Sequence, residues 1–170
     1  MRLPVVDGFQ LAAAGGRVSG SCAVAALERL QGALHANSGE LDYELRGLHD
    51  AQNHQNHPAL RLQVSGALEL TCQRCLGALL FRLDIDSMLV LATPAEAIDR
   101  RWDAPDSPDV VVGGKAMAVG AMIEDEILLA LPYAPRHEHC PAGAPGVEDA
   151  KASPFTGLRG LLDRGGRGKS

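Results

Sequence analysis

The sequence predicts an α+β domain built on an antiparallel sheet, open or curled toward a barrel, with a long hairpin and two main helices packed on it. Residues 60–72 and 79–91 alternate apolar and polar side chains, which is the two-residue period of strands with one wet face. Residues 21–35 and 115–131 instead repeat apolar side chains at helical spacing. This order of helix, strands and helix is typical of the α+β class rather than of alternating βαβ units.

The composition favours one globular domain with flexible ends. The chain has 170 residues, of which 46% are hydrophobic and 22% are charged, a balance that disordered chains lack. We place the single α+β domain at residues 1–140. Residues 141–170 are expected to form a linker, a short helical segment near Ser153 and a basic flexible tail.

The N-terminal third is expected to contain a helix followed by a strand. Leu27 and Leu30 belong to a set of apolar residues at helical spacing behind serines suited to cap a helix, which predicts a helix over about residues 21–35. Residues 41–45 then place an apolar side chain at every second position, which predicts a strand. Residues 50–58 are rich in Asn, Gln and His and are expected to form a polar loop.

The clearest pattern is the pair of runs that should form the hairpin. Even-numbered positions are apolar or small from Leu60 to Cys72, and odd-numbered positions are mostly apolar from Leu79 to Leu91. Gly66 suits a bulge or a bend, so one long curved strand and two shorter strands are both open. The two runs are expected to pair with each other.

The segment after the hairpin is expected to be a loop, a short strand and a helix. Residues 93–109 contain three prolines and no sustained period, which predicts a long exposed loop. Three valines at residues 110–112 suit a short strand that closes this loop. The second helix is predicted over residues 115–131, with Pro132 as its stop.

The expected turn of the hairpin carries Cys72 and Cys75, a Cys-x-x-Cys pair that can direct two sulfurs toward one point, as in zinc knuckles. A tetrahedral zinc site needs two more ligands, and His137 and Cys140 have a suitable spacing. The alternative is a tight turn without a cofactor, in which small buried thiols pack beneath the hairpin. A redox role fits less well, because redox pairs of this kind lie at helix N-termini.

The charge pattern favours a protein partner over naked nucleic acid. The formal net charge is -5, so strong binding to naked nucleic acid is not expected. The acidic run Glu124, Asp125 and Glu126 fans around the second helix, either as a solvated face or as a contact surface for a basic protein. Weak RNA contact is expected only where positive charge gathers, in a loop and in the C-terminal tail. These candidates are Arg100, Arg101, Trp102, Arg164, Arg167 and Lys169.

No arrangement of residues in the sequence indicates an enzyme. The sequence has no Gly-rich phosphate loop after a strand, no Gly-x-Ser-x-Gly nucleophile elbow and no His-Glu-x-x-His motif. The N-terminus lacks the apolar core and cleavage site of a signal peptide, and no apolar run approaches the ~20 residues that span a bilayer. We therefore expect a cytoplasmic protein without catalytic residues.

Three motifs in this order resemble the YceD family of large ribosomal RNA subunit accumulation proteins. They are Leu-Thr-Cys-Gln-Arg-Cys-Leu at residues 70–76, Met-Ile-Glu-Asp-Glu-Ile-Leu-Leu-Ala-Leu-Pro at residues 122–132, and Pro-Arg-His-Glu-His-Cys at residues 135–140. A Pro-Phe pair followed by leucines is similar to the family's C-terminal segment. The resemblance therefore covers about residues 20–162.

The resemblance implies a non-enzymatic ribosome biogenesis factor that supports synthesis, processing or stability of the large-subunit (23S) ribosomal RNA. It makes the hairpin turn and the acidic helix the best candidates for binding a basic ribosomal protein or assembly factor of the large-subunit precursor. These candidates are Cys72, Gln73, Arg74, Cys75, Glu124, Asp125, Glu126 and Pro132. The competing hypotheses are a small zinc-binding or redox module and an interaction domain unrelated to ribosomes.

Overall fold

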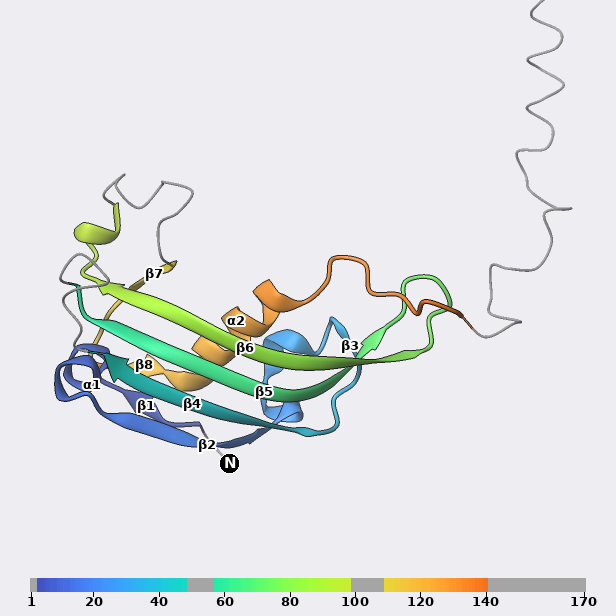
Figure 1. Ribbon diagram of the computed structural model, residues 1–170, viewed down its shortest axis with the longest axis horizontal. Helices are drawn as coiled ribbons and strands as arrows, with labels where there is room; N and C mark the ends of the chain where they lie inside the picture. Colours follow the sequence, from blue (N-terminus) through green and yellow to red (C-terminus); the bar gives the residue numbers. More distant parts are fainter. Residues whose placement is uncertain (1–2, 49–56, 99–108, 141–170) are drawn as a thin grey trace, which may run out of the picture.

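The computed structural model of the protein describes residues 3–48, 57–98 and 109–140 (Figure 1). Within these residues it contains eight strands, two α-helices and three short 3-10 turns. The strands are β1 (Val5–Val6), β2 (Arg17–Ala23), β3 (Leu34–Ala36), β4 (Glu40–Leu48), β5 (Ala59–Thr71), β6 (Ala78–Ala92), β7 (Asp109–Val112) and β8 (Met117–Ala118). The helices are α1 (Gly8–Ala14) and α2 (Val119–Ala130), and the turns are η1 (Val24–Ala26), η2 (Glu28–Leu30) and η3 (Glu96–Ile98).

The main sheet runs in the order β2-β4-β5-β6-β7, and β3 pairs with β5 outside this path. Its strand pairs are antiparallel except for β7, which lies parallel to β6. A separate two-stranded sheet joins β1 to β8. The α+β class with a mostly antiparallel sheet is therefore confirmed, whereas the sheet is open and not closed into a barrel.

The predicted long hairpin is present as β5 and β6. The two strands pair without interruption from Ala59 with Val90 to Thr71 with Ala78, so β5 is one long strand and not two. Gly66 lies inside it with φ of 151°, a backbone conformation that favours glycine. A Cβ atom at this position would come within 2.5 Å of the Leu41 side chain, so Gly66 permits close packing without a shift in register.

The sheet has one covered face and one face that is open around Arg61 and Asp84 but buried at one end, where Ala59, Val90 and Ala92 lie. Side chains of the covered face form the core together with α2, which runs along this side of the sheet in Figure 1. Leu62 of β5, Leu45 of β4 and Ile123 of α2 are fully buried members of it. The open face carries the intervening polar side chains, such as Arg61 and Asp84, which are exposed. This alternation is the predicted two-residue period.

The predicted helix at residues 21–35 is wrong. The chain instead forms the end of β2, the two turns η1 and η2, and β3. Strand β2 pairs with β4 from Arg17 opposite Arg46 to Ala23 opposite Glu40, so its residues are held by a partner distant in sequence. The leucines of the predicted helix are buried all the same, because the short turns and β3 direct them at the core. They are Leu27, Leu30 and Leu34, whereas Ala23 and Ala26 of the same apolar set are exposed.

The N-terminal helix of the protein is α1, which the sequence patterns above did not predict. The Asp7 side chain caps it by accepting a hydrogen bond from the backbone N–H of Gln10 at 2.9 Å. Gly15 ends it in the left-handed conformation, with φ of 58°. Both signals are visible in the sequence, but seven residues are too few for a clear helical period.

The second predicted helix is confirmed as α2, although it begins at Val119 and not at residue 115. Met117 and Ala118 form strand β8, which pairs with β1, so these two residues are extended and the helix begins after them. Pro132 follows the last helical turn, as predicted. Neither helix in the described part of the chain is long and apolar enough to cross a membrane.

Several predictions concern residues outside the described part of the chain. Most of the polar loop at residues 50–58 and of the loop at residues 93–109 lies there, and so do the linker, short helical segment and tail at residues 141–170. The predicted short strand at residues 110–112 is confirmed as part of β7.

Packing of α1 on the sheet should depend on the missing side chain of Gly47. A Cβ atom there would lie 2.0 Å from the backbone oxygen of Leu11. We expect Gly47→Ala to lower the free energy of unfolding by about 3 kcal/mol, near the upper end of overpacking costs, because backbone atoms would have to move. Urea unfolding followed by circular dichroism measures this change.

Gly32→Ala is the matched control, because a Cβ atom at Gly32 meets nothing within 4 Å. We expect its effect to stay within about 0.5 kcal/mol. Equal stabilities of the two variants would contradict the proposed close packing of α1 against β4.

Candidate metal centre

The hairpin ends in a compact turn that buries two thiols. The backbone N–H of Cys72 donates to the oxygen of Gly77 at 2.9 Å, and the N–H of Leu76 donates to the oxygen of Cys72 at 2.8 Å. Leu76 closes the turn in the left-handed conformation, with φ of 60°. Cys72 and Cys75 are buried inside this turn, whereas Gln73 and Arg74 at its outer side are exposed.

The segment that follows α2 returns to this turn. The backbone N–H of Gln73 donates to the oxygen of Pro135 at 2.8 Å, which fixes the segment against the tip of the hairpin. The Nε2 atom of His137 lies 2.9 Å from the backbone oxygen of Ala78 at the start of β6. Two hydrogen bonds therefore hold residues 135–137 in place from both sides of the turn.

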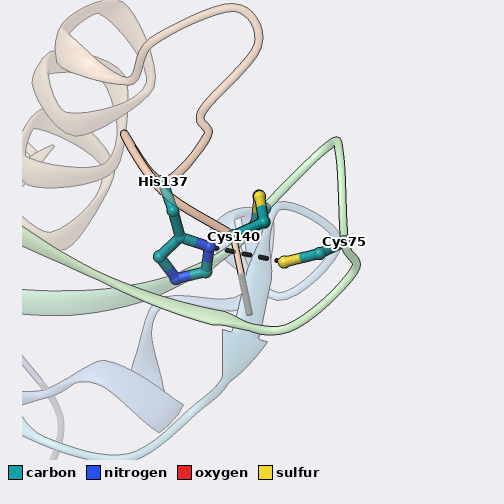
Figure 2. A group of neighbouring side chains, drawn as sticks. Cys75, His137 and Cys140 are labelled. Carbon is teal, nitrogen blue, oxygen red and sulfur yellow. Dashed lines mark hydrogen bonds between the residues drawn. The ribbon is translucent and has the colours of Figure 1, made fainter. Parts of the chain in front are cut away.

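These contacts gather four side chains, which we call the tip cluster. Its members are Cys72, Cys75, His137 and Cys140, and their sulfur and nitrogen atoms all lie within 4.8 Å of one another. The Sγ atoms of Cys72 and Cys140 are 3.9 Å apart, and Cys75 Sγ is 3.4 Å from Nδ1 of His137. Figure 2 shows Cys75, His137 and Cys140 converging from the two segments. The structure thus brings together the four candidate ligands that the sequence indicated.

His139 and Cys22 are residues of ligand type that lie outside the tip cluster. His139 is exposed and takes no part in it, as its position next to Cys140 predicts. Cys22 is buried in β2. Burial and the nearby carboxylates of Glu40 and Asp42 raise the pKa of the Cys22 thiol, so it has the properties of an ordinary core cysteine.

The thiols of the tip cluster differ in acidity. Burial raises the pKa of Cys72, but the backbone N–H groups of Cys75, His137 and Arg74 oppose this effect, and the pKa falls to about 5. Burial, the adjoining thiols of Cys75 and Cys72 and their charges raise the pKa of Cys140 to about 11. A thiolate at Cys72 therefore opposes loss of the proton from Cys140.

The acidic run on α2 makes contacts inside the protein. Glu124 is buried and accepts a hydrogen bond from the backbone N–H of Arg29 at 2.9 Å. Asp125 forms an exposed ion pair with the guanidinium of Arg29. Glu126 is buried and accepts a hydrogen bond from the hydroxyl of Ser87 on β6. The three carboxylates thus join α2 to η2 and to the covered face of the sheet, which sequence reasoning did not foresee.

The remaining candidate residues fall into two groups. Pro132 is exposed just after α2. The predicted weak RNA contacts all lie outside the described residues. They are Arg100, Arg101, Trp102, Arg164, Arg167 and Lys169.

Sequence reasoning missed a group of acids on the open face of the sheet, which we call the open-face acids. They are Asp42 and Glu44 on β4 and Asp84 and Asp86 on β6. Ser65 of β5 lies between Asp42 and Asp84, and the next pair flanks Gln63 in the same way. The signal was present as acids at alternate positions of two strands, but only the strand order places them side by side.

The open-face acids differ in their partners. Glu44 pairs with Arg17 at 2.6 Å, and Asp86 accepts hydrogen bonds from Arg61 and, at 3.1 Å, from Gln63. The carboxylates of Asp42 and Asp84 have no hydrogen bond or ion pair within the described residues. A shallow hollow of about 310 Å³ lies between them over β5. Two unpaired carboxylates therefore border the centre of the open face.

Comparison with protein-family models finds a match for this chain. A family model described as "Large ribosomal RNA subunit accumulation protein YceD" matches residues 60–162, which is more than half of the chain. The matched region begins at the hairpin and includes the whole tip cluster. No curated protein and no solved structure shows a significant match.

The contacts of the acidic run predict unequal effects for neighbouring substitutions. We expect Glu124→Ala to lower the free energy of unfolding by about 1–3 kcal/mol, because a part-buried backbone N–H group loses its partner. Asp125→Ala should cost much less, since its ion pair is exposed. Denaturant unfolding of both variants measures the difference, and equal losses would contradict the structural role of Glu124.

Proposed function

The chain belongs to the YceD family of large ribosomal RNA subunit accumulation proteins, and from this premise we propose that it supports accumulation of the 23S ribosomal RNA as a binding factor rather than as an enzyme. The match to the family model is the observation that carries the proposal. A binding factor also agrees with the absence of a catalytic motif from the sequence.

We propose further that the partner is a basic ribosomal protein or a basic assembly factor. The chain carries a formal net charge of -5, which repels phosphate and attracts positively charged proteins. A ribosomal protein that binds RNA needs a basic surface, because Lys and Arg neutralise the phosphate charges. That surface is exposed until the protein binds RNA. An acidic factor can hold such a surface until the RNA competes for it.

The open-face acids are the better contact surface, compared with the acidic run on α2. Glu124 and Glu126 are buried and already bonded within the protein, so a partner would have to displace those contacts. Asp42 and Asp84 are exposed and have no hydrogen bond or ion pair among the described residues. A guanidinium or ammonium group that approaches the hollow between them would meet a carboxylate on either side.

Removal of the gene tests the ribosomal role. We expect cells that lack the protein to contain less 23S ribosomal RNA relative to small-subunit RNA, because the large-subunit RNA would be degraded or incompletely processed. The ratio is measured by electrophoresis of total RNA, with re-expression of the protein as the control. An unchanged ratio, with normal large-subunit particles on a sucrose gradient, would contradict the proposed function.

Charge reversal tests the contact surface. We expect Asp42→Lys combined with Asp84→Lys to reduce co-purification of basic large-subunit proteins by about tenfold or more, since attraction becomes repulsion. The control reverses Glu28 and Asp109 to lysine, two exposed acids outside the open face, and changes the net charge equally. Quantitative mass spectrometry after ribonuclease treatment provides the measurement.

The two double variants separate local recognition from net charge. Equal losses of co-purified proteins from the two double variants would mean that only the net charge matters. Retention of every partner by both variants would mean that the contact lies elsewhere. Loss of all partners from the unmodified protein after ribonuclease treatment would favour tethering through RNA. Each of these outcomes would contradict binding at the open face.

A further inference from the structure

We infer that the tip cluster binds one Zn²⁺ ion in a closed tetrahedral site. The ion would join the turn of the long hairpin to the segment after α2 through four ligand atoms from the two segments. Zinc binding here does not depend on the ribosomal role, because it rests on the geometry of these side chains alone.

The donor set suits zinc. Three thiols and one imidazole are among the ligand combinations of structural zinc sites, and soft thiolate ligands disfavour magnesium and calcium. Within the described residues, this is the one group of at least three such side chains whose ligand atoms converge on one point. The other described cysteine, Cys22, lies in β2 outside the group.

Two of the six distances between ligand atoms are close to the edges of a coordination tetrahedron. With Zn–S bonds of about 2.3 Å, two sulfur ligands of one zinc ion lie about 3.8 Å apart, and a sulfur and a nitrogen ligand about 3.6 Å apart. The Sγ atoms of Cys72 and Cys140 are separated by 3.9 Å, and Cys75 Sγ and His137 Nδ1 by 3.4 Å. All four ligand atoms lie within 4.8 Å of one another, so they are gathered around one point.

The imidazole is oriented as a ligand. The backbone oxygen of Ala78 can only accept a hydrogen bond, so Nε2 of His137 carries a proton and donates it across 2.9 Å. In the neutral ring, Nδ1 then has a free lone pair, and it faces the sulfur of Cys75. Metal-bound histidines commonly donate their second nitrogen to a backbone carbonyl in this way.

The site has the character of a structural rather than a catalytic metal centre. Four protein ligands complete a tetrahedron and leave no position for water or substrate. Cys72 is fully buried and Cys75 is nearly so, which shields the ion from solvent. Gln73 and Arg74, exposed at the outer side of the turn, would be held rigidly by it.

A disulfide explains less of the geometry. A bond between Cys72 and Cys140 would require their sulfurs to approach to about 2.05 Å, well below the 3.9 Å observed. It would also leave unexplained why His137 turns its Nδ1 atom toward Cys75. The pair also lies at a turn between strands and not at a helix N-terminus, where Cys-x-x-Cys pairs of redox proteins lie.

Metal analysis of the full-length protein tests the site. The protein is purified without chelator under reducing conditions, and zinc is measured by inductively coupled plasma mass spectrometry. We expect about one zinc ion per chain, and a fall of at least about tenfold in affinity for added Zn²⁺ on replacing a ligand. His137→Ala and Cys140→Ser should show this loss.

Matched variants control for non-specific binding and for misfolding. His139→Ala removes the neighbouring exposed imidazole, and Cys22→Ser removes a thiol outside the tip cluster, so both should retain zinc. Substitution of Co²⁺ in the unmodified protein should give the thiolate-to-metal charge-transfer band of a tetrahedral site. Chelation of the metal from the unmodified protein should speed hydrogen exchange at the backbone N–H of Gln73, because its hydrogen bond to Pro135 would be less protected. This measurement needs no variant.

Three outcomes would overturn the inference. One is less than about a tenth of an ion per chain after reconstitution of the reduced protein with Zn²⁺. Another is an equal loss of zinc from His137→Ala and His139→Ala. The third is a disulfide between Cys72 and Cys140 in protein purified without oxidant, detected by mass spectrometry of peptides.

Discussion

The register between β5 and β6 is the constraint on which the rest of the structure depends. The strands pair without interruption along the whole of β5, so most of the apolar side chains of the two runs lie on the same face, as in the pairs Leu60 with Leu89, Val64 with Ile85 and Leu70 with Leu79. A shift by one residue would turn the core residues of one strand toward solvent. The covered face that receives α2, the open face and the position of the turn are all consequences of this pairing.

The tip of the hairpin shows how a local turn becomes a site through distant chain segments. Cys75 and His137 are separated by 62 residues, and Cys72 and Cys140 by 68. Ordering the segment after α2 on the surface costs conformational entropy. Few apolar side chains offset this cost, since Tyr133 in this segment is fully exposed. The hydrogen bond between Gln73 and Pro135 offsets part of this cost, and a bound ion would offset more.

Carboxylates serve two physical roles in this protein. On α2, Glu124 and Glu126 satisfy hydrogen-bond donors at the edge of the core, where an unpaired N–H or hydroxyl group would be costly. On the open face, Asp42 and Asp84 are exposed and have no hydrogen bond or ion pair among the described residues, so a partner could pair with them. The densest acidic run in the sequence is therefore a poor guide to the acidic surface, because local density says nothing about what faces each side chain.

The sequence by itself determined the long hairpin, β4, α2 and the four residues of the tip cluster, because periods of two and of 3.6 residues and ligand spacings are local patterns. It misassigned residues 21–35, where pairing of β2 with β4 overrides an apolar spacing typical of a helix. Only the tertiary structure decided that His137 and Cys140 meet Cys72, and that Asp42 lies across from Asp84. Such contacts depend on strand order and on the return of a distant segment, which no local pattern encodes.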